Sequence, residues 1–404
     1  MARLLSVAPE PQPADAHGVP SEADCIVCTR CIYDSRVAAI SFDENGVCNY
    51  CRQVEDLERQ YGTGLERGRQ ALQAIIDEIR RQGAGKKYDC VIGVSGGTDS
   101  SYLLLKAVEW GLRPLAVHYD NTWNSATATQ NIRKLTARLG VDLWTHVLDN
   151  KEADDIKKAF LLAGVAEFDA DTDIAFVQVL RSAAARAGVK YILEGHSFKA
   201  EGLSPVGQNY LDGAYVADVQ RRFGTLRPRT FPNLTFWQFM KWVLVYRQKF
   251  IRPLWYVPYS KEEARRELFE KVGWRYYGGH HLENRASTFA HTVWLPQRFQ
   301  TDYRNLSLAA SARAGLISRE EALAIYSKPV IPDRELIAYV KKRLSFSDAE
   351  YTRIMVGPKR TFRDFRTYKR RFERLRPLFF LLARANMVPM SFYLKYCFPL
   401  KQQP

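Results

Sequence analysis

The stretch KYDCVIGVSGGTDSSYLLL, residues 87–105, decides the fold of this chain. Its first half, YDCVIGV, is a short continuous apolar run that predicts a buried strand, and its second half has the apolar spacing of a helix. Between the two halves lies SGGTDSS, residues 95–101. A glycine-rich turn at the start of a helix offers unpaired backbone N–H groups, which bind phosphate. The stretch therefore predicts nucleotide binding at a strand-to-helix turn.

Each residue type in SGGTDSS suits phosphate binding. Gly96 and Gly97 lack a Cβ, so the backbone can approach a phosphate closely. The serines offer hydroxyl donors, and Asp99 either caps the helix or binds a Mg²⁺ ion held by the phosphates. The predicted nucleotide contacts from this loop are Ser95, Gly96, Gly97, Thr98, Asp99, Ser100 and Ser101. The alternative is a solvated turn with a Ser/Asp cap. A Walker loop is excluded because the chain contains no GxxxxGK[ST].

Strands and helices alternate after this loop. The expected strands are PLAVHY (114–119), VDLWTHVL (141–148) and KYILEG (190–195), with helical segments between them. Such alternation predicts an α/β fold with a doubly wound parallel sheet, which binds ligands at the carboxyl ends of its strands.

Beyond about residue 225 the strand pattern stops, and a mainly helical, basic region follows. At 404 residues the chain is long enough for several units. The expected units are a disordered leader (1–24), a zinc-binding CxxC…CxxC module (25–60), a connecting helix (61–87), the ATP-binding domain (88–225), a helical substrate or partner region (226–330) and a basic helical tail (331–404).

Composition gives an ordinary balance of 46% hydrophobic and 25% charged residues, but a net charge of +15. This charge indicates a polyanionic partner such as nucleic acid, anionic lipid or a phosphate-bearing small molecule. No apolar run reaches the roughly 18–20 residues needed to span a bilayer, and the leader lacks the features of a secretory signal. We therefore expect a cytoplasmic protein.

Five of the seven cysteines lie within residues 25–51. CTRC and CNYC form two CxxC pairs sixteen residues apart, which is typical of structural zinc held by Cys28, Cys31, Cys48 and Cys51. Cys25 is a third member at the same spacing, so an iron–sulfur cluster and unmetallated thiols stay as alternatives. Cys90 and Cys397 stand alone.

SGGxDS is the signature of the PP-loop ATP pyrophosphatases. The combination with CTRC, FDENGVCNYC and LRPLAVHYDNTWNS (112–125) resembles the N-acetyl sugar amidotransferases of surface-polysaccharide biosynthesis. Further matches are Thr172–Asp173, Glu201–Gly202, Asn209–Tyr210, WRYYGGHHLEN (274–284), WLPQRF (294–299) and ISREEAL (317–323). The likeness covers about 25–326. It departs at EGHSF (194–198), where a second Gly and an Asn are expected in place of His196, and it does not reach the tail.

The resemblance implies a site and a reaction. His118, Tyr119, Asp120 and Asn121, together with Glu194, Gly195 and His196, would line the adenosine and substrate cleft. Asp173, Glu201, His281 and Glu283, with Asp99, would be the catalytic set, although each could instead be a solvated or capping residue. For His118 a half-buried structural histidine is an equal alternative. The family adenylates an acetamido oxygen on a nucleotide-activated sugar or nonulosonic acid, releases pyrophosphate, and lets ammonia displace AMP to form an acetamidino group in lipopolysaccharide or O-antigen synthesis.

The sequence also bears on where the ammonia comes from and on which other functions are possible. Residue 2 is Ala2, and no Cys–His arrangement for a glutaminase is apparent, so the resemblance implies a separate glutaminase partner. The rival function is tRNA thiolation, which the basic charge favours, but only two isolated cysteines follow Cys51. A nucleotide-binding scaffold without activity is a third hypothesis, which the intact loop disfavours.

The tail offers a last hypothesis. Aromatic residues of 362–379 recur at intervals of three and four and predict one continuous helix flanked by arginines. Such a helix could lie on an anionic membrane, at the inner membrane face, or pack against the protein.

Overall fold

The computed structural model describes residues 25–203, 210–278, 282–385 and 387–399. The expected leader (1–24), His281 and Asn209 lie outside the described residues.

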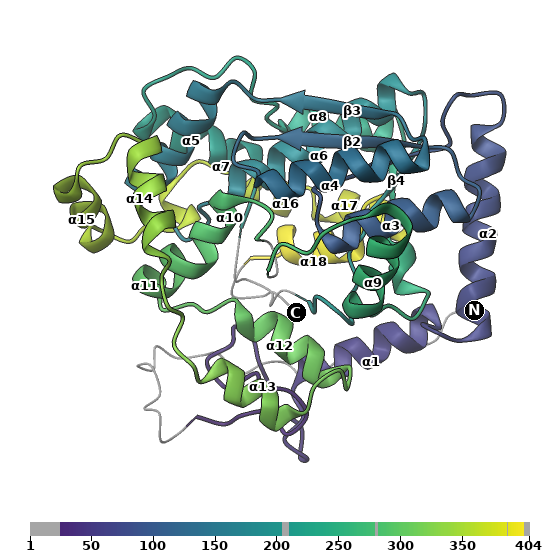
Figure 1. Cartoon of the computed structure of the whole chain (residues 1–404), viewed down its shortest axis with the longest axis horizontal. Helices are drawn as coiled ribbons and strands as arrows, with labels where there is room; N and C mark the ends of the chain where they lie inside the picture. The colour runs from purple at the N-terminus through teal and green to yellow at the C-terminus, as the bar shows by residue number, and fades with distance from the viewer. Residues whose placement is uncertain (1–24, 204–209, 279–281, 386, 400–404) are drawn as a thin grey trace.

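The centre of the molecule is a five-stranded sheet in the order β3-β2-β1-β4-β5, and all of its neighbouring strands are parallel (Figure 1). The strands are β1 (Cys90–Gly93), β2 (Pro114–Asp120), β3 (Leu143–Val147), β4 (Tyr191–Leu193) and β5 (Lys249–Ile251). The first four lie where the sequence predicts them, which confirms the parallel α/β fold. The fifth corrects the expectation that no strand follows residue 225. Its three residues are too short a run to give a strand pattern, but they pair with β4 along its length.

Helices cover both faces of the sheet. The side chains of Cys90 and Ile92 pack on one face with α2, α3, α4 and α9, whereas Val91 faces α6 on the other. This alternation follows from the two-residue period of a strand. The helices of this part are α1 (Asn49–Tyr61), α2 (Glu66–Gly83), α3 (Thr98–Glu109), α4 (Ala126–Leu139), α5 (Asn150–Ala163), α6 (Ala170–Arg186), α7 (Gly213–Phe223), α8 (Phe236–Leu244) and α9 (Lys261–Val272).

Several of the C-terminal helices share a core with α5 and α7. Trp294 is buried there and donates from its indole to the carbonyl of Val165 at 2.8 Å. The C-terminal helices are α10 (Arg285–Phe289), α11 (Leu295–Phe299), α12 (Arg304–Arg313), α13 (Arg319–Tyr326), α14 (Arg334–Arg343), α15 (Asp348–Val356), α16 (Lys369–Arg374), α17 (Arg376–Arg384) and α18 (Met390–Tyr396). Of these, α10, α11, α14 and α15 contribute to this core. The π-helical turn η3 (Ala290–Trp294) joins α10 to α11, and the short 3-10 turns are η2 (Pro253–Trp255) and η4 (Phe362–Asp364). The region is therefore built onto the sheet domain.

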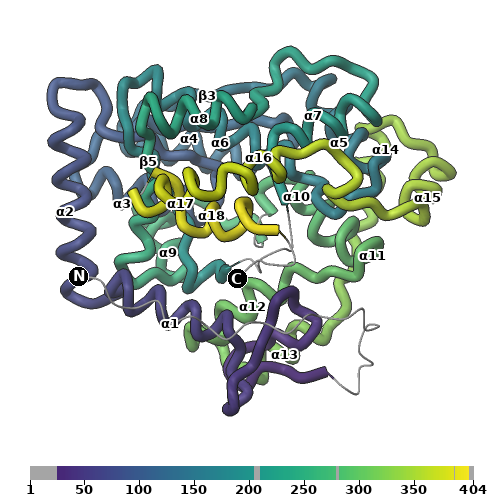
Figure 2. The backbone as a smooth tube through the Cα atoms, turned by 180° about the vertical axis from the view of Figure 1, so that it is seen from behind, coloured from purple at the N-terminus to yellow at the C-terminus, as the bar shows by residue number. Residues whose placement is uncertain are grey.

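The tail differs from the expected single helix over 362–379. It forms η4, α16 and α17, with an extended residue at Phe365 and a new helix that begins at Arg376, with Pro377 in its first turn. Proline lacks the N–H that a continuing helix would need. Phe365, Phe372 and Phe379 are buried. Figure 2 shows α16, α17 and α18 on the same side as α8, and their aromatic side chains form one cluster with it. The aromatic stripe therefore packs against the protein.

Among the described residues, no helix combines the length and apolar character needed to cross a bilayer.

Candidate functional site

The SGGTDSS loop connects the carboxyl end of β1 to the first turn of α3. The N-cap residue of α3 is Gly97, which has no side chain to cap that turn. The Ser95 hydroxyl accepts from the Gly97 N–H at 3.2 Å and contacts the Ser100 hydroxyl at 3.3 Å, so the loop closes on itself. The first turn of α3 therefore lacks the side-chain cap that the alternative interpretation, a solvated turn with a Ser/Asp cap, requires. Like any helix N-terminus, this turn carries a partial positive charge.

Two glycines of the site are required by their surroundings. Gly96 has φ +82°, and a Cβ there would lie 2.4 Å from the carbonyl oxygen of Ala128. The Gly96 carbonyl accepts from the Trp274 indole at 3.0 Å. At Gly195, after β4, a Cβ would lie 2.7 Å from the carbonyl oxygen of Asp99. The loop is therefore packed between the ends of neighbouring elements and held in one conformation.

A cavity of about 680 Å³ opens at this edge of the sheet. Its volume lies in the range of small-ligand and nucleotide sites. The structure brings most of the sequence-predicted residues to its wall: Ser95, Gly97, Thr98, Asp99, Ser100, His118, Asn121, Asp173, Gly195, Glu201 and Glu283. The helical region thus contributes Glu283 to the same cavity as the loop, with its Oε1 3.3 Å from the Ser95 hydroxyl.

Three predicted residues do not line the cavity. Gly96 and Ser101 lie behind the loop, where Ser101 is fully buried. Asp120 instead holds the turn after β2, since its Oδ1 accepts from the Thr122 N–H at 2.8 Å and from the Asn124 amide at 3.0 Å. Their predicted contact with nucleotide is not supported by this arrangement.

His118 lines the cavity, but both of its ring nitrogens are engaged. Nδ1 lies 2.8 Å from the Val94 carbonyl and therefore donates, and Nε2 accepts from the Asn124 amide at 3.1 Å. Burial lowers the pKa of His118. The neutral ring connects the end of β1 to the loop after β2. This arrangement agrees with the alternative given in the sequence analysis, a histidine with a structural role.

An amide network joins the sheet to the helical region. Asn284 donates to Oδ1 of Asn121 at 2.9 Å and to Oδ1 of Asn124 at 3.1 Å. Asn121 in turn donates to the Thr172 hydroxyl at 3.1 Å. Buried Lys157 donates to that hydroxyl at 3.1 Å and ion-pairs with Asp171 and Asp169. Thr172 and Asn284 both lie in stretches that the sequence resemblance includes, whereas Lys157 became apparent only in three dimensions.

Sequence reasoning missed the basic side of the cavity. Lys261, at the start of α9, lies 3.2 Å from Asp99 and 3.6 Å from Glu201, and the Tyr259 hydroxyl also bonds to Asp99. Burial alone would lower the pKa of Lys261, but the two carboxylates outweigh it and raise the pKa. A lysine directly after the cap Ser260 of an amphipathic helix was the available signal. Arg252 and Arg265 also line the cavity.

A second cavity of about 290 Å³ adjoins the first. Asp169, Asp173, Ser287 and Leu306 line both. Its own wall includes Glu167 and His291, and burial raises the pKa of Glu167. The site is therefore one cleft with two chambers, and Asp173 stands between them.

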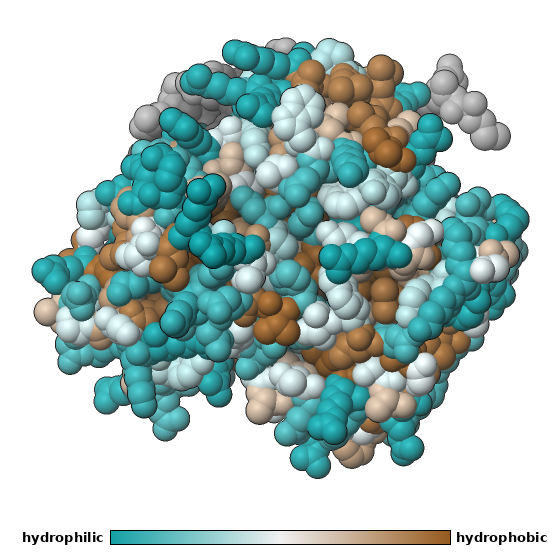
Figure 3. Space-filling view, turned by 90° about the horizontal axis from the view of Figure 1, so that it is seen from above, coloured by the Kyte–Doolittle hydropathy of each residue, from teal (hydrophilic) through white to brown (hydrophobic). Residues whose placement is uncertain are grey.

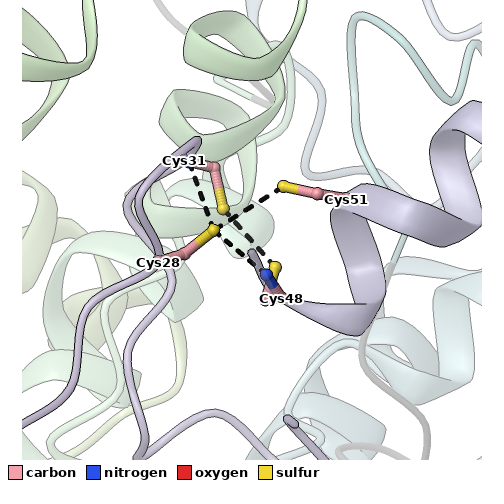
Figure 4. Close-up of side chains that lie close together, drawn as sticks. All are labelled: Cys28, Cys31, Cys48 and Cys51. Atoms are coloured by element: carbon pink, nitrogen blue, oxygen red, sulfur yellow. Dashed lines mark hydrogen bonds between the residues drawn. The ribbon is translucent and has the colours of Figure 1, made fainter. Parts of the chain in front are cut away.

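The four predicted metal ligands come together in the N-terminal module (Figure 4). The sulfur of Cys28 lies 3.9 Å from that of Cys51, and the sulfur of Cys31 lies 3.8 Å from that of Cys48. Metal–sulfur bonds of about 2.3 Å in a tetrahedron separate sulfurs by about 3.8 Å, so the geometry is compatible with zinc. Cys25 is outside the group and accepts from the Ser35 hydroxyl at 3.7 Å.

Helices α12 and α13 support this cluster (Figure 1). Arg313 donates to the sulfur of Cys51 at 3.2 Å and to that of Cys31 at 3.7 Å, and Arg319 donates to the carbonyl of Cys28 at 2.9 Å. Four thiolates around a divalent ion leave a net negative charge, which a guanidinium offsets. The cysteine module is therefore fastened to the helical region that also lines the cleft through Leu306.

Part of the chain is similar to a known protein family. Residues 283–377 match the family model for the C-terminal domain of WbpG-like LPS biosynthesis proteins. No curated protein matches the chain. Similar solved structures include an NMN synthetase from Francisella tularensis (TM-score 0.30, 13% identity, 70% of this chain and 95% of that chain). They also include an NH3-dependent NAD synthetase from Campylobacter jejuni subsp. jejuni NCTC 11168 (TM-score 0.30, 14% identity, 72% and 98%).

The family match supports the resemblance to the surface-polysaccharide amidotransferases that the sequence motifs indicate. It begins at Glu283, includes WLPQRF, and continues past residue 330 into the tail, which the resemblance did not cover.

Proposed function

We propose that the chain is an ATP-dependent, AMP-forming amidotransferase that converts an acetamido group on a nucleotide-activated sugar or nonulosonic acid into an acetamidino group, in lipopolysaccharide or O-antigen synthesis. One observation carries the proposal. The uncapped SGGTDSS turn and Glu283, the first residue of the WbpG-like match, face the same cavity. Phosphate binding and family-specific chemistry would therefore meet in one place.

The reaction divides naturally between the two sides of the cleft. The loop and Lys261 would bind the phosphates, and Mg²⁺ held near Asp99 would neutralise charge on them. The amide oxygen attacks the α-phosphorus of ATP, and pyrophosphate leaves. Ammonia then adds to the amide carbon and AMP departs with the former amide oxygen, leaving C=NH in its place.

Carboxylates on the cleft wall can manage the protons. Asp173 and Glu201 line the main cavity, and Asp173 also lines the second chamber. The attacking ammonia must lose a proton as it adds, and a nearby carboxylate can accept it. We propose that the second chamber receives ammonia or the sugar, whereas the main chamber holds ATP.

The cysteine module is proposed to hold one structural zinc ion. Four buried sulfurs would complete a tetrahedron and leave no open position for catalysis. A tRNA-thiolating enzyme would use a cysteine close to the adenylated base for sulfur transfer. Within the described chain, the residues lining the cavity include no cysteine, so we favour the sugar amidotransferase.

The test is an assay of purified protein with ATP, ammonium and candidate nucleotide-sugars. The expected products are AMP, pyrophosphate and a sugar in which NH has replaced O, detected by mass spectrometry. Stoichiometric ADP and phosphate would overturn the adenylation chemistry. Turnover with unmodified tRNA but with no sugar would favour the rival function.

A further inference from the structure

Helix α8 and the turn after it expose an unusual set of hydrophobic side chains. Phe236, Met240 and Val243 face inward and are buried. The opposite side exposes Trp237 (74%) and Leu244 (43%), and the turn that follows exposes Val245 (70%). Seen from above, hydrophobic side chains gather at the upper edge of the molecule, the side on which α8 lies (Figure 3). Exposing a large indole and aliphatic side chains to water is unfavourable, and burying them against a binding partner would be favourable.

The stretch of chain that carries these side chains is also basic. No aspartate or glutamate occurs between Asp218 and Glu262. Lys241 lies on the exposed side of α8 one turn after Trp237, and Arg247 is exposed in the turn. A helix with tryptophan and aliphatic residues on a face that also carries cations is the pattern of a segment that lies in the headgroup region of an anionic bilayer.

The neighbouring helix extends the surface. Phe239 of α8 stacks on Phe379 of α17 with ring centroids 6.3 Å apart, so the two helices lie side by side (Figure 2). Leu381 of α17 is 64% exposed, and Arg384 ends that helix. No acid follows Glu373 in the chain. The basic, apolar character therefore continues from one helix to the next.

The place of α8 in the fold suits a peripheral anchor. The turn after α8 leads into Lys249, which pairs with Tyr191 at the start of β4. It therefore lies at the amino edge of the sheet, whereas the cleft opens at the carboxyl edge. A membrane touching Val245 would leave the cleft open to soluble substrates.

We infer that the exposed face of α8 and the turn 245–247 dock on an anionic lipid membrane, with Trp237, Leu244 and Val245 in the headgroup region and Lys241 and Arg247 near lipid phosphates. This surface replaces the aromatic stripe of the tail, which is buried. It is independent of the reaction that the cleft performs.

Vesicle co-sedimentation of the full chain tests the inference. We expect binding to vesicles of phosphatidylcholine with phosphatidylglycerol, little binding to phosphatidylcholine alone, and release at high salt. Trp237→Gln with Val245→Ser should abolish most binding. Lys241→Gln and Arg247→Gln should each weaken it about fivefold, because each cation near an anionic surface contributes about 1 kcal/mol.

Val356→Ser is the matched control, because Val356 is 78% exposed and lies on α15. It should bind like the wild type, and all variants should keep the wild-type circular dichroism and turnover of soluble substrate. The inference is overturned if the wild type does not bind anionic vesicles. Equal loss in the α8 and Val356 variants would overturn it as well.

Discussion

At the scale of single residues, Asp99 joins the phosphate loop to the basic wall of the cleft. Its carboxylate accepts from Tyr259 and faces Lys261. Asp99→Asn keeps the size and one acceptor oxygen but removes the charge that would hold Mg²⁺. We expect ATP-dependent turnover to fall about 100-fold or more, the loss typical of removing one group that stabilises charge in a transition state.

Steady-state kinetics with pyrophosphate release as the readout measures this change. Asp56→Asn is the matched control, since Asp56 is exposed on α1 far along the chain from the loop. The control should retain full activity. Wild-type turnover in the Asp99 variant would show that this carboxylate takes no part in the reaction.

Lys261 gives a prediction about pH. Its pKa is raised by Asp99 and Glu201 in spite of burial. The stability that its charge contributes is therefore fully present below the ordinary lysine pKa of about 10.4, and it is lost as the pH rises through the raised pKa. Lys261→Met removes that contribution and takes the cation away from Asp99 and Glu201. We expect the free energy of unfolding to fall by about 3 kcal/mol at neutral pH and the deficit to shrink in strong alkali.

Urea unfolding at neutral and alkaline pH tests this dependence. Lys271→Met provides the comparison, because Lys271 pairs with Glu109 and Glu267 on the surface and should matter by less than about 1 kcal/mol. A deficit for Lys261→Met that stays constant with pH would show that the side chain contributes packing alone.

At the scale of elements, the CxxC module depends on α12 and α13 as much as on its own sequence. Arg313 reaches two of the sulfurs, and the module's Ile32 and Tyr33 are buried in a cluster with Ala309 of α12. Cys28→Ser with Cys31→Ser should abolish binding of one metal ion per chain and lower the melting temperature, because metal binding contributes directly to folding.

Elemental analysis and thermal unfolding measure the two effects. Cys25→Ser is the matched control, since Cys25 lies outside the four-sulfur group, and it should leave metal content unchanged. Iron with acid-labile sulfide in the wild type would contradict the zinc proposal. Because α12 also lines the cleft through Leu306, the double variant should lose activity together with metal.

The sequence predicted these elements unevenly, for physical reasons. Four strands and the loop were predictable because buried parallel strands are continuous apolar runs and a phosphate turn needs glycines. β5 was missed because Lys249–Ile251 is too short for such a run. The tail was predicted as one helix because aromatic spacing was weighed above the helix-starting Pro377.

Some site residues were likewise predictable from the sequence, and others were found only in the structure. Ser95 and Glu283 were predictable from motifs, whereas the contact between them depends on residues 188 positions apart. Lys261 was missed because a lysine at a helix start is usually solvated, and only the fold shows that it faces Asp99 and Glu201. Periodicity reports which face of an element is buried, but not which elements meet.

At the scale of the whole molecule, the cysteine inventory bears on the source of ammonia. Four cysteines form the buried four-sulfur group, and Cys90 is fully buried in β1. Burial raises the pKa of Cys397 to about 12. A glutaminase needs a reactive thiolate, and a thiol whose pKa is raised by burial is inert. Among the described cysteines, only the partly exposed Cys25 stands apart, and it contacts a serine.

We therefore predict that the purified chain works with ammonium salts alone, and that glutamine supports turnover only when a separate glutaminase is present. At a fixed concentration of ammonium salt the rate should rise with pH, because only the neutral amine is nucleophilic. Cys25→Ser should leave the ammonium-dependent rate unchanged. Glutamate release from glutamine by the purified chain would contradict the prediction, and loss of that release in Cys25→Ser would identify the nucleophile. A further assay supplies glutamine and the glutaminase partner and adds a reagent that traps free ammonia. If turnover is unaffected by the trap, the two proteins pass ammonia directly from one to the other. The second chamber, beside Asp173, could then receive that ammonia.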